Sequence, residues 1–174
     1  MINRWQIVIP FNARWEDGCD YAQQTIRLTA KHNDVVAVPL AHEQSIWQAA
    51  TSVWRGSIFT QFYQAVVFTP IILLPFRSIA VLKSLNILLN AVILRLILMS
   101  SSGTNTKKGR HKQLVWFFEP AHISIWLQVF AGWNSLYDCV DYWLGFPGHI
   151  QKAHSWLVQR ATWMVVNSKA LLEA

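Results

Sequence analysis

Two short apolar runs near the start of the chain flank an amphipathic stretch. Gln6 to Phe11 is rich in β-branched residues and closes at Asn12, and Asp34 to Leu40 repeats the pattern. Such runs are typical of strands that are buried on both faces of a parallel sheet. Between them, Asp20 to Lys31 places its apolar residues on roughly one face of a helix. The first forty residues therefore predict a βαβ unit with a parallel strand pair.

The alternation of strand and helix patterns continues along the rest of the chain. We expect further strands at 65–68, 113–118, 135–140 and 163–166, and helices at 45–62, 79–99, 121–130, 147–161 and 168–174. The pattern is weakest in the first of these helices. About six strands interleaved with helices predict an α/β fold with a Rossmann-like, doubly wound and mainly parallel sheet. The length of 174 residues fits a single domain.

Ile79 to Met99 is the most apolar segment of the chain, which raises the question of a membrane span. A spanning helix needs about 20 mostly apolar residues, and Lys83, Asn86, Asn90 and Arg95 all oppose insertion. A helix packed within the domain is therefore favoured. The alternative is an interfacial helix whose basic neighbours contact an anionic membrane surface.

A net charge of +6 and a pI near 9.6 indicate an acidic partner. Much of the charge lies between two apolar segments, at Lys107, Lys108, Arg110 and Lys112. If the preceding helix rests on a membrane, these four side chains would contact anionic lipid; otherwise the run is a solvated loop. Nucleic acid is disfavoured because the ten tryptophans lie inside apolar segments and are not interleaved with Lys or Arg.

The cysteines and the first residues bear on the cellular compartment. Cys19 and Cys139 match neither a CxxC pair nor a metal-ligand cluster, so we expect both to be reduced and structural. Met1 to Trp5 leads into a strand pattern, without the apolar region of a signal peptide. These features favour a cytoplasmic protein, and peripheral attachment to the inner face of the membrane stays open.

Ligands of doubly wound sheets bind beyond the carboxyl ends of the strands, so the residues after each strand are the candidates for chemistry. In chain order they are Asp17, Gly18, Glu119, His122, Asp138, Asp141, Asn167 and Ser168. Gly18 either serves a turn or lets the backbone approach a phosphate or hydroxyl of a ligand. Glu119 would orient substrate hydroxyls and His122 would polarise or deprotonate one, although a single His is more often structural.

The absence of several known motifs narrows the range of possible activities further. The sequence has no GxGxxG, Walker A, HExxH or nucleophile-elbow pattern, which disfavours a tightly held dinucleotide, a nucleoside triphosphate and hydrolase activity. Asp138 and Asp141 would hold a divalent cation, cap the next helix or bond to backbone amides. The last two roles are favoured because no third ligand lies nearby in sequence. We therefore expect neither a metal nor a cofactor.

Two motifs in the last third of the chain carry a family resemblance. Ser135 to Trp143 has the sequence SLYDCVDYW, and Ala161 to Leu172 has the sequence ATWMVVNSKALL. Together they resemble the signature of the N-terminal domain in GT-B glycosyltransferases of the family 4 type. Phe11 to Trp15 and Val115 to Pro120 fall in the family's order too. Tyr142 stands where that family usually has an Asp, so no role that needs a carboxylate there is carried over.

The resemblance implies that residues 1–174 are one half of a GT-B fold, the acceptor-side domain, without the C-terminal domain that binds the nucleotide sugar. It implies transfer of a hexosyl group from a nucleotide-sugar donor to a glycan or lipid-linked acceptor, usually with retention and without an obligatory metal. The isolated half is expected to be inactive. The alternative hypothesis is a non-catalytic module that binds a membrane surface or a partner through residues 79–112.

The resemblance also implies roles for the residues that follow the strands. Asp17 and Gly18 would approach the donor phosphates and the acceptor. Glu119 and His122 would line the acceptor pocket and take part in catalysis. The remaining positions would contact substrate or order the strand ends: Asp138, Asp141, Asn167 and Ser168.

Overall fold

The structure is a computed structural model. It describes residues 4–11, 20–39, 42–45, 47, 50–51, 55, 58–74, 80–101, 112–120, 130–139 and 147–166. The strands are β1 (Trp5–Pro10), β2 (Asp34–Val38), β3 (His42–Ser45), β4 (Phe59–Phe62), β5 (Ala65–Phe68), β6 (Ile71–Leu74), β7 (Lys112–Phe117), β8 (Asn134–Cys139) and β9 (Trp163–Val166). The helices are α1 (Asp20–Thr29), α3 (Ala80–Ser101) and α5 (Gly148–Arg160).

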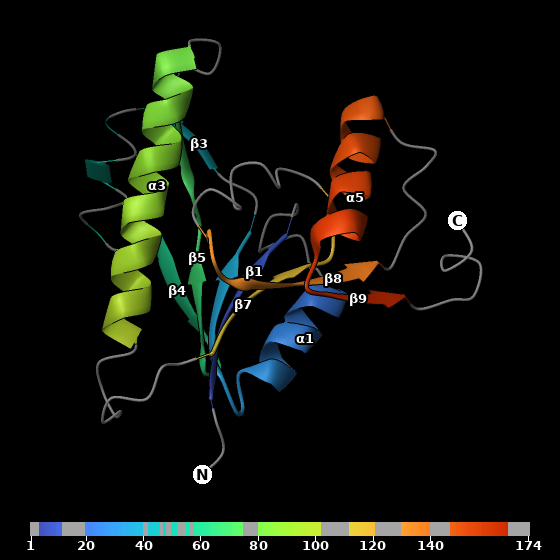
Figure 1. Cartoon of the computed structure of the whole chain (residues 1–174). Coiled ribbons are helices and arrows are strands. Elements are labelled where there is room, and N and C mark those ends of the chain that lie inside the picture. Colours follow the sequence, from blue (N-terminus) through green and yellow to red (C-terminus); the bar gives the residue numbers. More distant parts are fainter. Residues whose placement is uncertain are drawn as a thin grey trace.

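Seven of the strands form the main sheet, in the order β4-β5-β2-β1-β7-β8-β9 (Figure 1). All neighbours in this sheet run parallel except β4, which is antiparallel to β5. Numbered along the chain, the six parallel strands have the spatial order 3-2-1-4-5-6, which is the order of Rossmann-type sheets. β3 and β6 form a separate parallel pair. The prediction of an α/β fold with a mainly parallel, Rossmann-like sheet is confirmed.

The helices lie on both faces of the sheet, as the strand order requires. From β1 the chain moves through α1 to β2 in one direction, and from β8 through α5 to β9 in the other. A right-handed crossover places the helix on opposite faces for the two directions. Accordingly, α1 packs on one face of the sheet, whereas α3 and α5 pack on the other (Figure 1).

Each face of the sheet has its own hydrophobic core. Under α1, Ala22 and Ile26 pack against residues such as Ile9 and Val67 of the strands. On the opposite face, α3 and α5 contribute buried leucines, and the buried members of this second core are Val8, Val36, Val38, Ile58, Phe68, Leu94, Leu98, Val115, Phe117, Phe130, Tyr137, Cys139 and Leu157. Burial of one such aliphatic side chain contributes about 1.5–3 kcal/mol. The near-continuous apolar strands of the sequence are thus explained by packing on both sides.

A buried polar network ties α3 to the sheet. Gln6 in β1 is 5% exposed, and its Nε2 donates to the carbonyl oxygen of Leu98 at 2.9 Å. Nε2 of Gln113, on the neighbouring β7, donates to Oε1 of Gln6 at 3.2 Å. Buried amide groups need such partners, because an unsatisfied one costs about 1–3 kcal/mol. The network therefore helps to fix which turn of α3 rests on β1.

The prediction of a helix at 45–62 is wrong for the last part of this range. Phe59–Phe62 is the strand β4, and it pairs with β5 through a hairpin whose turn is Tyr63 and Gln64. Tyr63 has a φ of 53°, a left-handed conformation that costs an L-residue about 1–2 kcal/mol. The sequence has no Gly, Asn or Asp at this turn, so the usual hairpin signal is missing. Pairing with the edge of the sheet decides the structure instead. The small sheet of β3 and β6 was also not predicted.

The other expected elements lie close to their predicted bounds. The helix expected at 79–99 is α3 (Ala80–Ser101), and it packs on the sheet as the favoured hypothesis required. The helices expected at 168–174 and, apart from Phe130, at 121–130 lie outside the described residues. Cys139 is a buried free thiol, as expected, whereas Cys19 lies outside the described residues.

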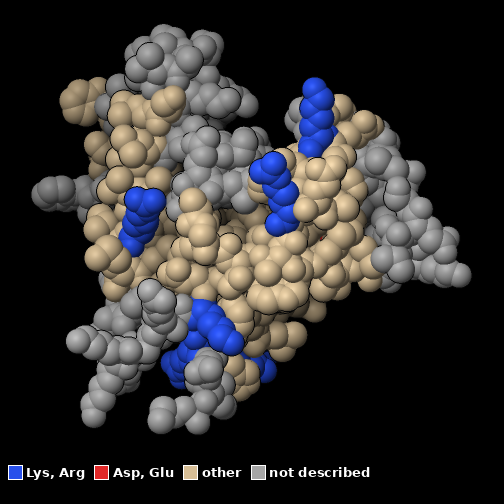
Figure 2. All heavy atoms as spheres, in the orientation of Figure 1, with Lys and Arg blue, Asp and Glu red and all other residues tan. Residues whose placement is uncertain are grey.

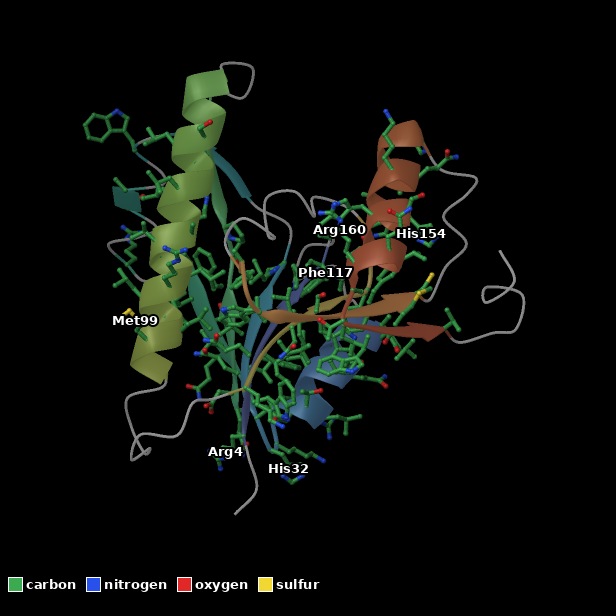
Figure 3. All side chains as sticks on the ribbon, viewed as in Figure 1. Arg4, His32, Met99, Phe117, His154 and Arg160 are labelled. Atoms are coloured by element: carbon green, nitrogen blue, oxygen red, sulfur yellow. The ribbon has the colours of Figure 1, made fainter. Side chains whose placement is uncertain are left out.

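A second polar contact holds α5 against β8. The hydroxyl of the fully buried Tyr137 and Nδ1 of His154 share a hydrogen bond of 2.8 Å. Partial burial of the imidazole lowers the pKa of His154. His154 is labelled on α5 in Figure 3. The neutral imidazole is therefore the form that the folded protein favours.

We expect this contact to make folding weaker in mild acid. The pKa of His154 is lower in the folded than in the unfolded state. The contribution of this residue to the free energy of unfolding is therefore fully present above the unfolded pKa of about 6.5 and is lost as pH falls through the folded pKa. Urea unfolding at pH 7.5 and pH 5 measures the loss. His154→Gln should reduce the difference in the free energy of unfolding between pH 7.5 and pH 5. His32→Gln, at an exposed position, should leave this difference unchanged. An unchanged difference in His154→Gln would contradict the assignment.

Candidate functional site

The carboxyl ends of β1 and β7 lie next to each other at the point where the strand order reverses. Ligands of Rossmann-type sheets bind at this position. Phe11 follows β1, and its backbone N–H donates to the carbonyl oxygen of Val38 at 3.0 Å. Phe118 follows β7 and is buried in the core under α1. Two buried phenylalanines thus form the apolar base of the edge where a ligand is expected.

Tyr21, in the first turn of α1, reaches across this edge to β8. Its hydroxyl donates to Oδ2 of Asp138 at 2.9 Å. Its ring packs edge-on against Phe118, with 5.3 Å between the ring centroids and an interplanar angle of 76°. Because β7 lies between β1 and β8 in the sheet, Tyr21 and Asp138 connect the start of α1 with the strand beyond β7. The sequence positions of the two residues are 117 apart.

The environment of the pair determines the protonation of Tyr21. Asp138 is 4% exposed, whereas Tyr21 is 54% exposed. Desolvation raises the pKa of Tyr21, and the hydrogen bond and charge of Asp138 raise it further. Tyr21 therefore stays protonated as the donor to the buried carboxylate, while much of its ring faces solvent. An exposed aromatic ring fixed beside a carboxylate is suited to an amphipathic ligand with hydroxyl groups.

Trp116 and Glu119 complete the described part of this edge. Nε1 of Trp116 is buried and has no hydrogen-bond partner, the one such side-chain atom among the described residues. Its ring lies 5.7 Å from the ring of Phe118, between the centroids. Glu119 is half-buried two residues after the end of β7. The edge thus combines a carboxylate, an indole donor and aromatic surface.

The structure brings together only part of the predicted site. Asp138 and Glu119 lie at the carboxyl ends of the adjacent strands β8 and β7, as expected. The other candidates lie outside the described residues, and they are Asp17, Gly18, His122, Asp141, Asn167 and Ser168. Asp138 bonds to a side chain of α1, which neither the capping role nor the cation role had anticipated. The described residues contain no group of three His, Cys, Asp or Glu side chains that could hold a metal ion.

Lys112 is the one described member of the basic run. It is the first residue of β7, and its Nζ lies 5.3 Å from the ring centroid of Trp5. This position is at the amino end of the parallel strands, where Lys112 pairs with Trp5 of β1. Lys107, Lys108 and Arg110 lie outside the described residues. Lys112 is therefore at the edge of the sheet opposite to Tyr21 and Asp138.

The sequence pattern did not single out Tyr21 or Trp116 as site residues. Tyr21 lies in the first turn of a helix and Trp116 lies inside a strand, so neither directly follows a strand end. The available signal was the first turn of α1 itself, because helices that follow the first strand start at the ligand-binding edge. No family model matches this chain, and no curated protein matches it.

Proposed function

We propose that this chain is the acceptor-side half of a two-domain glycosyltransferase. Such an enzyme transfers a sugar from a nucleotide-sugar donor to a glycan or lipid-linked acceptor. The observation that carries the proposal is the Tyr21 ring, held by the buried Asp138 at the carboxyl edge of a Rossmann-like sheet. Asp138 belongs to the motif SLYDCVDYW, which resembles the signature of this enzyme class. The strand order fits the fold that the proposal requires, and the resemblance alone points to glycosyltransferases.

The described side chains suit the binding of a saccharide. Sugars present apolar C–H faces and hydroxyl groups, which pack on aromatic rings and bond to carboxylates. Tyr21 offers the ring and Glu119 offers a carboxylate directly after the neighbouring strand β7. The N–H of Trp116 lies near the same rings but is buried, so it is not counted among the groups that contact the saccharide. In this proposal these groups orient the acceptor hydroxyl, and stabilisation of the departing diphosphate belongs to a second domain.

The absence of a phosphate-binding glycine pattern in the sequence fits this division of labour. A Rossmann domain that holds a dinucleotide has a GxGxxG pattern after its first strand, and Phe11 to Gly18 has none. The donor nucleotide is therefore assigned mainly to the other half of the enzyme. His122, Asp17 and Gly18 remain proposed contacts that follow β7 and β1 in sequence.

Binding measurements on the 174-residue chain test the proposal. We expect alkyl glycosides, such as octyl glucoside and octyl mannoside, to bind with dissociation constants near millimolar, as weak interactions of small ligands do. UDP-glucose and GDP-mannose should bind more weakly still. Glu119→Gln should weaken glycoside binding about fivefold, or about 1 kcal/mol, because a neutral hydrogen bond replaces one to a charged group. Titration calorimetry or chemical-shift mapping provides the readout.

Asp34→Asn is the matched control, because Asp34 is also half-buried but lies at the amino end of β2. It should leave glycoside binding unchanged. Tight binding of the nucleotide sugars with no glycoside binding would overturn the proposal. So would sugar transfer by the 174-residue chain alone, since the proposal assigns the donor site to another domain.

A further inference from the structure

Helix α3 has two apolar faces, and only one of them is covered. Leu94 and Leu98 are buried against the sheet, with Ile93 and Ile97 packed beside them. The outer face of α3 consists of exposed apolar side chains: Leu85, Leu88, Leu89, Val92, Leu96 and Met99. At 3.6 residues per turn these six positions fall within an arc of about 100°, nearly opposite Leu94. The outer face is therefore one continuous apolar strip along the helix.

The exposure of this strip is unusual for a surface helix. Leu88 and Leu96 are each 60% exposed, and Met99 is 72% exposed. Single exposed apolar residues are common, but a contiguous row of them marks an interaction surface. Figure 3 shows Met99 pointing away from the sheet on the outer side of α3. The outer face thus lacks cover from the described part of the chain.

The stretch of sequence that contains α3 carries charge of a single sign. Residues 44–118 contain eight Lys and Arg but no Asp or Glu. Arg95 is exposed at the border of the outer face, and the run from Lys107 to Lys112 follows the helix in sequence. Wherever the structure gives the burial of the side chain, Lys and Arg are exposed, whereas Asp34, Asp138 and Glu119 are half-buried or buried. Figure 2 shows Lys and Arg side chains, in blue, over α3, over α5 and at the lower edge of the view.

We propose that the outer face of α3 is a docking surface for an anionic membrane, with the helix lying parallel to the bilayer. An apolar strip enters the boundary between headgroups and acyl chains, while flanking Lys and Arg contact anionic lipid headgroups. A second copy of the chain is a poorer occupant. Pairing of two outer faces would bring the same positive charges together without an acidic side chain between 44 and 118 to offset them.

The packing of α3 against the sheet limits how deeply the helix can enter the bilayer. The inner face stays in the core through Leu94 and Leu98, and the Leu98 carbonyl stays bonded to Gln6. Among the described residues, no helix is long and apolar enough to cross a membrane. Docking therefore uses the outer face alone, and α3 remains part of the folded domain. This inference does not rest on the proposed glycosyltransferase function.

Vesicle co-sedimentation of the 174-residue chain tests the docking surface. We expect binding to vesicles of phosphatidylglycerol and phosphatidylcholine, much weaker binding to phosphatidylcholine alone, and loss of binding at 1 M salt. Leu88→Gln and Leu96→Gln should each lower the partition coefficient about tenfold, by removing buried apolar contact. Arg95→Gln should lower it about fivefold through the lost charge.

Leu28→Gln is the matched control. Leu28 is 59% exposed on α1, on the opposite face of the sheet, so its replacement should not change vesicle binding. Thermal unfolding of each variant confirms that it is folded. The proposal fails if the wild-type chain does not bind anionic vesicles, or if Leu28→Gln weakens binding as much as Leu88→Gln. A dimer that Leu88→Gln dissociates, without vesicle binding, would assign the outer face to self-association instead.

Discussion

Replacing Leu94 by alanine is expected to lower the free energy of unfolding by roughly 3–5 kcal/mol. Leu94 is fully buried and packs in the core that α3, α5 and the sheet share. Its removal takes apolar contacts from several strands at once and leaves a cavity that α3, bonded to Gln6 through Leu98, cannot close by shifting. Urea unfolding measures the change, and a fall of this size removes a large fraction of the stability of an ordinary domain.

Leu96→Ala provides the control on the same helix. Leu96 is 60% exposed, so we expect its replacement to change the free energy of unfolding by no more than about 0.5 kcal/mol. The two variants make the same chemical change two residues apart, and only the orientation of α3 separates them. Equal losses in both variants would show that the outer face of α3 is covered in the folded protein. That result would also contradict the proposal that the outer face of α3 is a docking surface.

Replacing Tyr21 by phenylalanine is expected to lower the free energy of unfolding by about 1–3 kcal/mol at pH 7. The ring and its contact with Phe118 are kept, but the buried carboxylate of Asp138 loses the hydroxyl that donates to it. Tyr63→Phe is the matched control, because Tyr63 is 60% exposed and its contact with Arg27 uses the ring. It should have little effect.

Two further measurements separate the Tyr21–Asp138 hydrogen bond from a general packing effect. In an Asp138→Asn background the cost of Tyr21→Phe should shrink, since the charged acceptor is gone. Alkaline titration gives the second test. The raised pKa of Tyr21 contributes stability that is fully present below the unfolded value of about 10 and is lost as pH rises through the folded pKa. The wild-type chain should therefore lose more stability above pH 10 than Tyr21→Phe. Equal losses would contradict the bond.

The sequence predicted where two of the candidate residues lie relative to their strands. Asp138 and Glu119 were expected at the ends of their strands, and the structure places them there. Tyr21 was missed, because the contact between α1 and β8 joins residues 117 positions apart and depends on which strands are neighbours. Periodicity reports the local environment of a strand, not its partner. A polar pair formed across three strands therefore has no signal in the sequence.

The sequence by itself determined the alternation of strands and helices, because a strand buried on both faces must be apolar at nearly every position, as in Ile7 to Ile9. Only the tertiary structure decided the strand order and the hairpin at Phe59–Phe62, since edge pairing outweighed the local helix pattern. It also decided which side of α3 is covered. That helix is apolar around most of its circumference, so periodicity could not distinguish the face of Leu94 from that of Leu96. Contact with the sheet made the distinction.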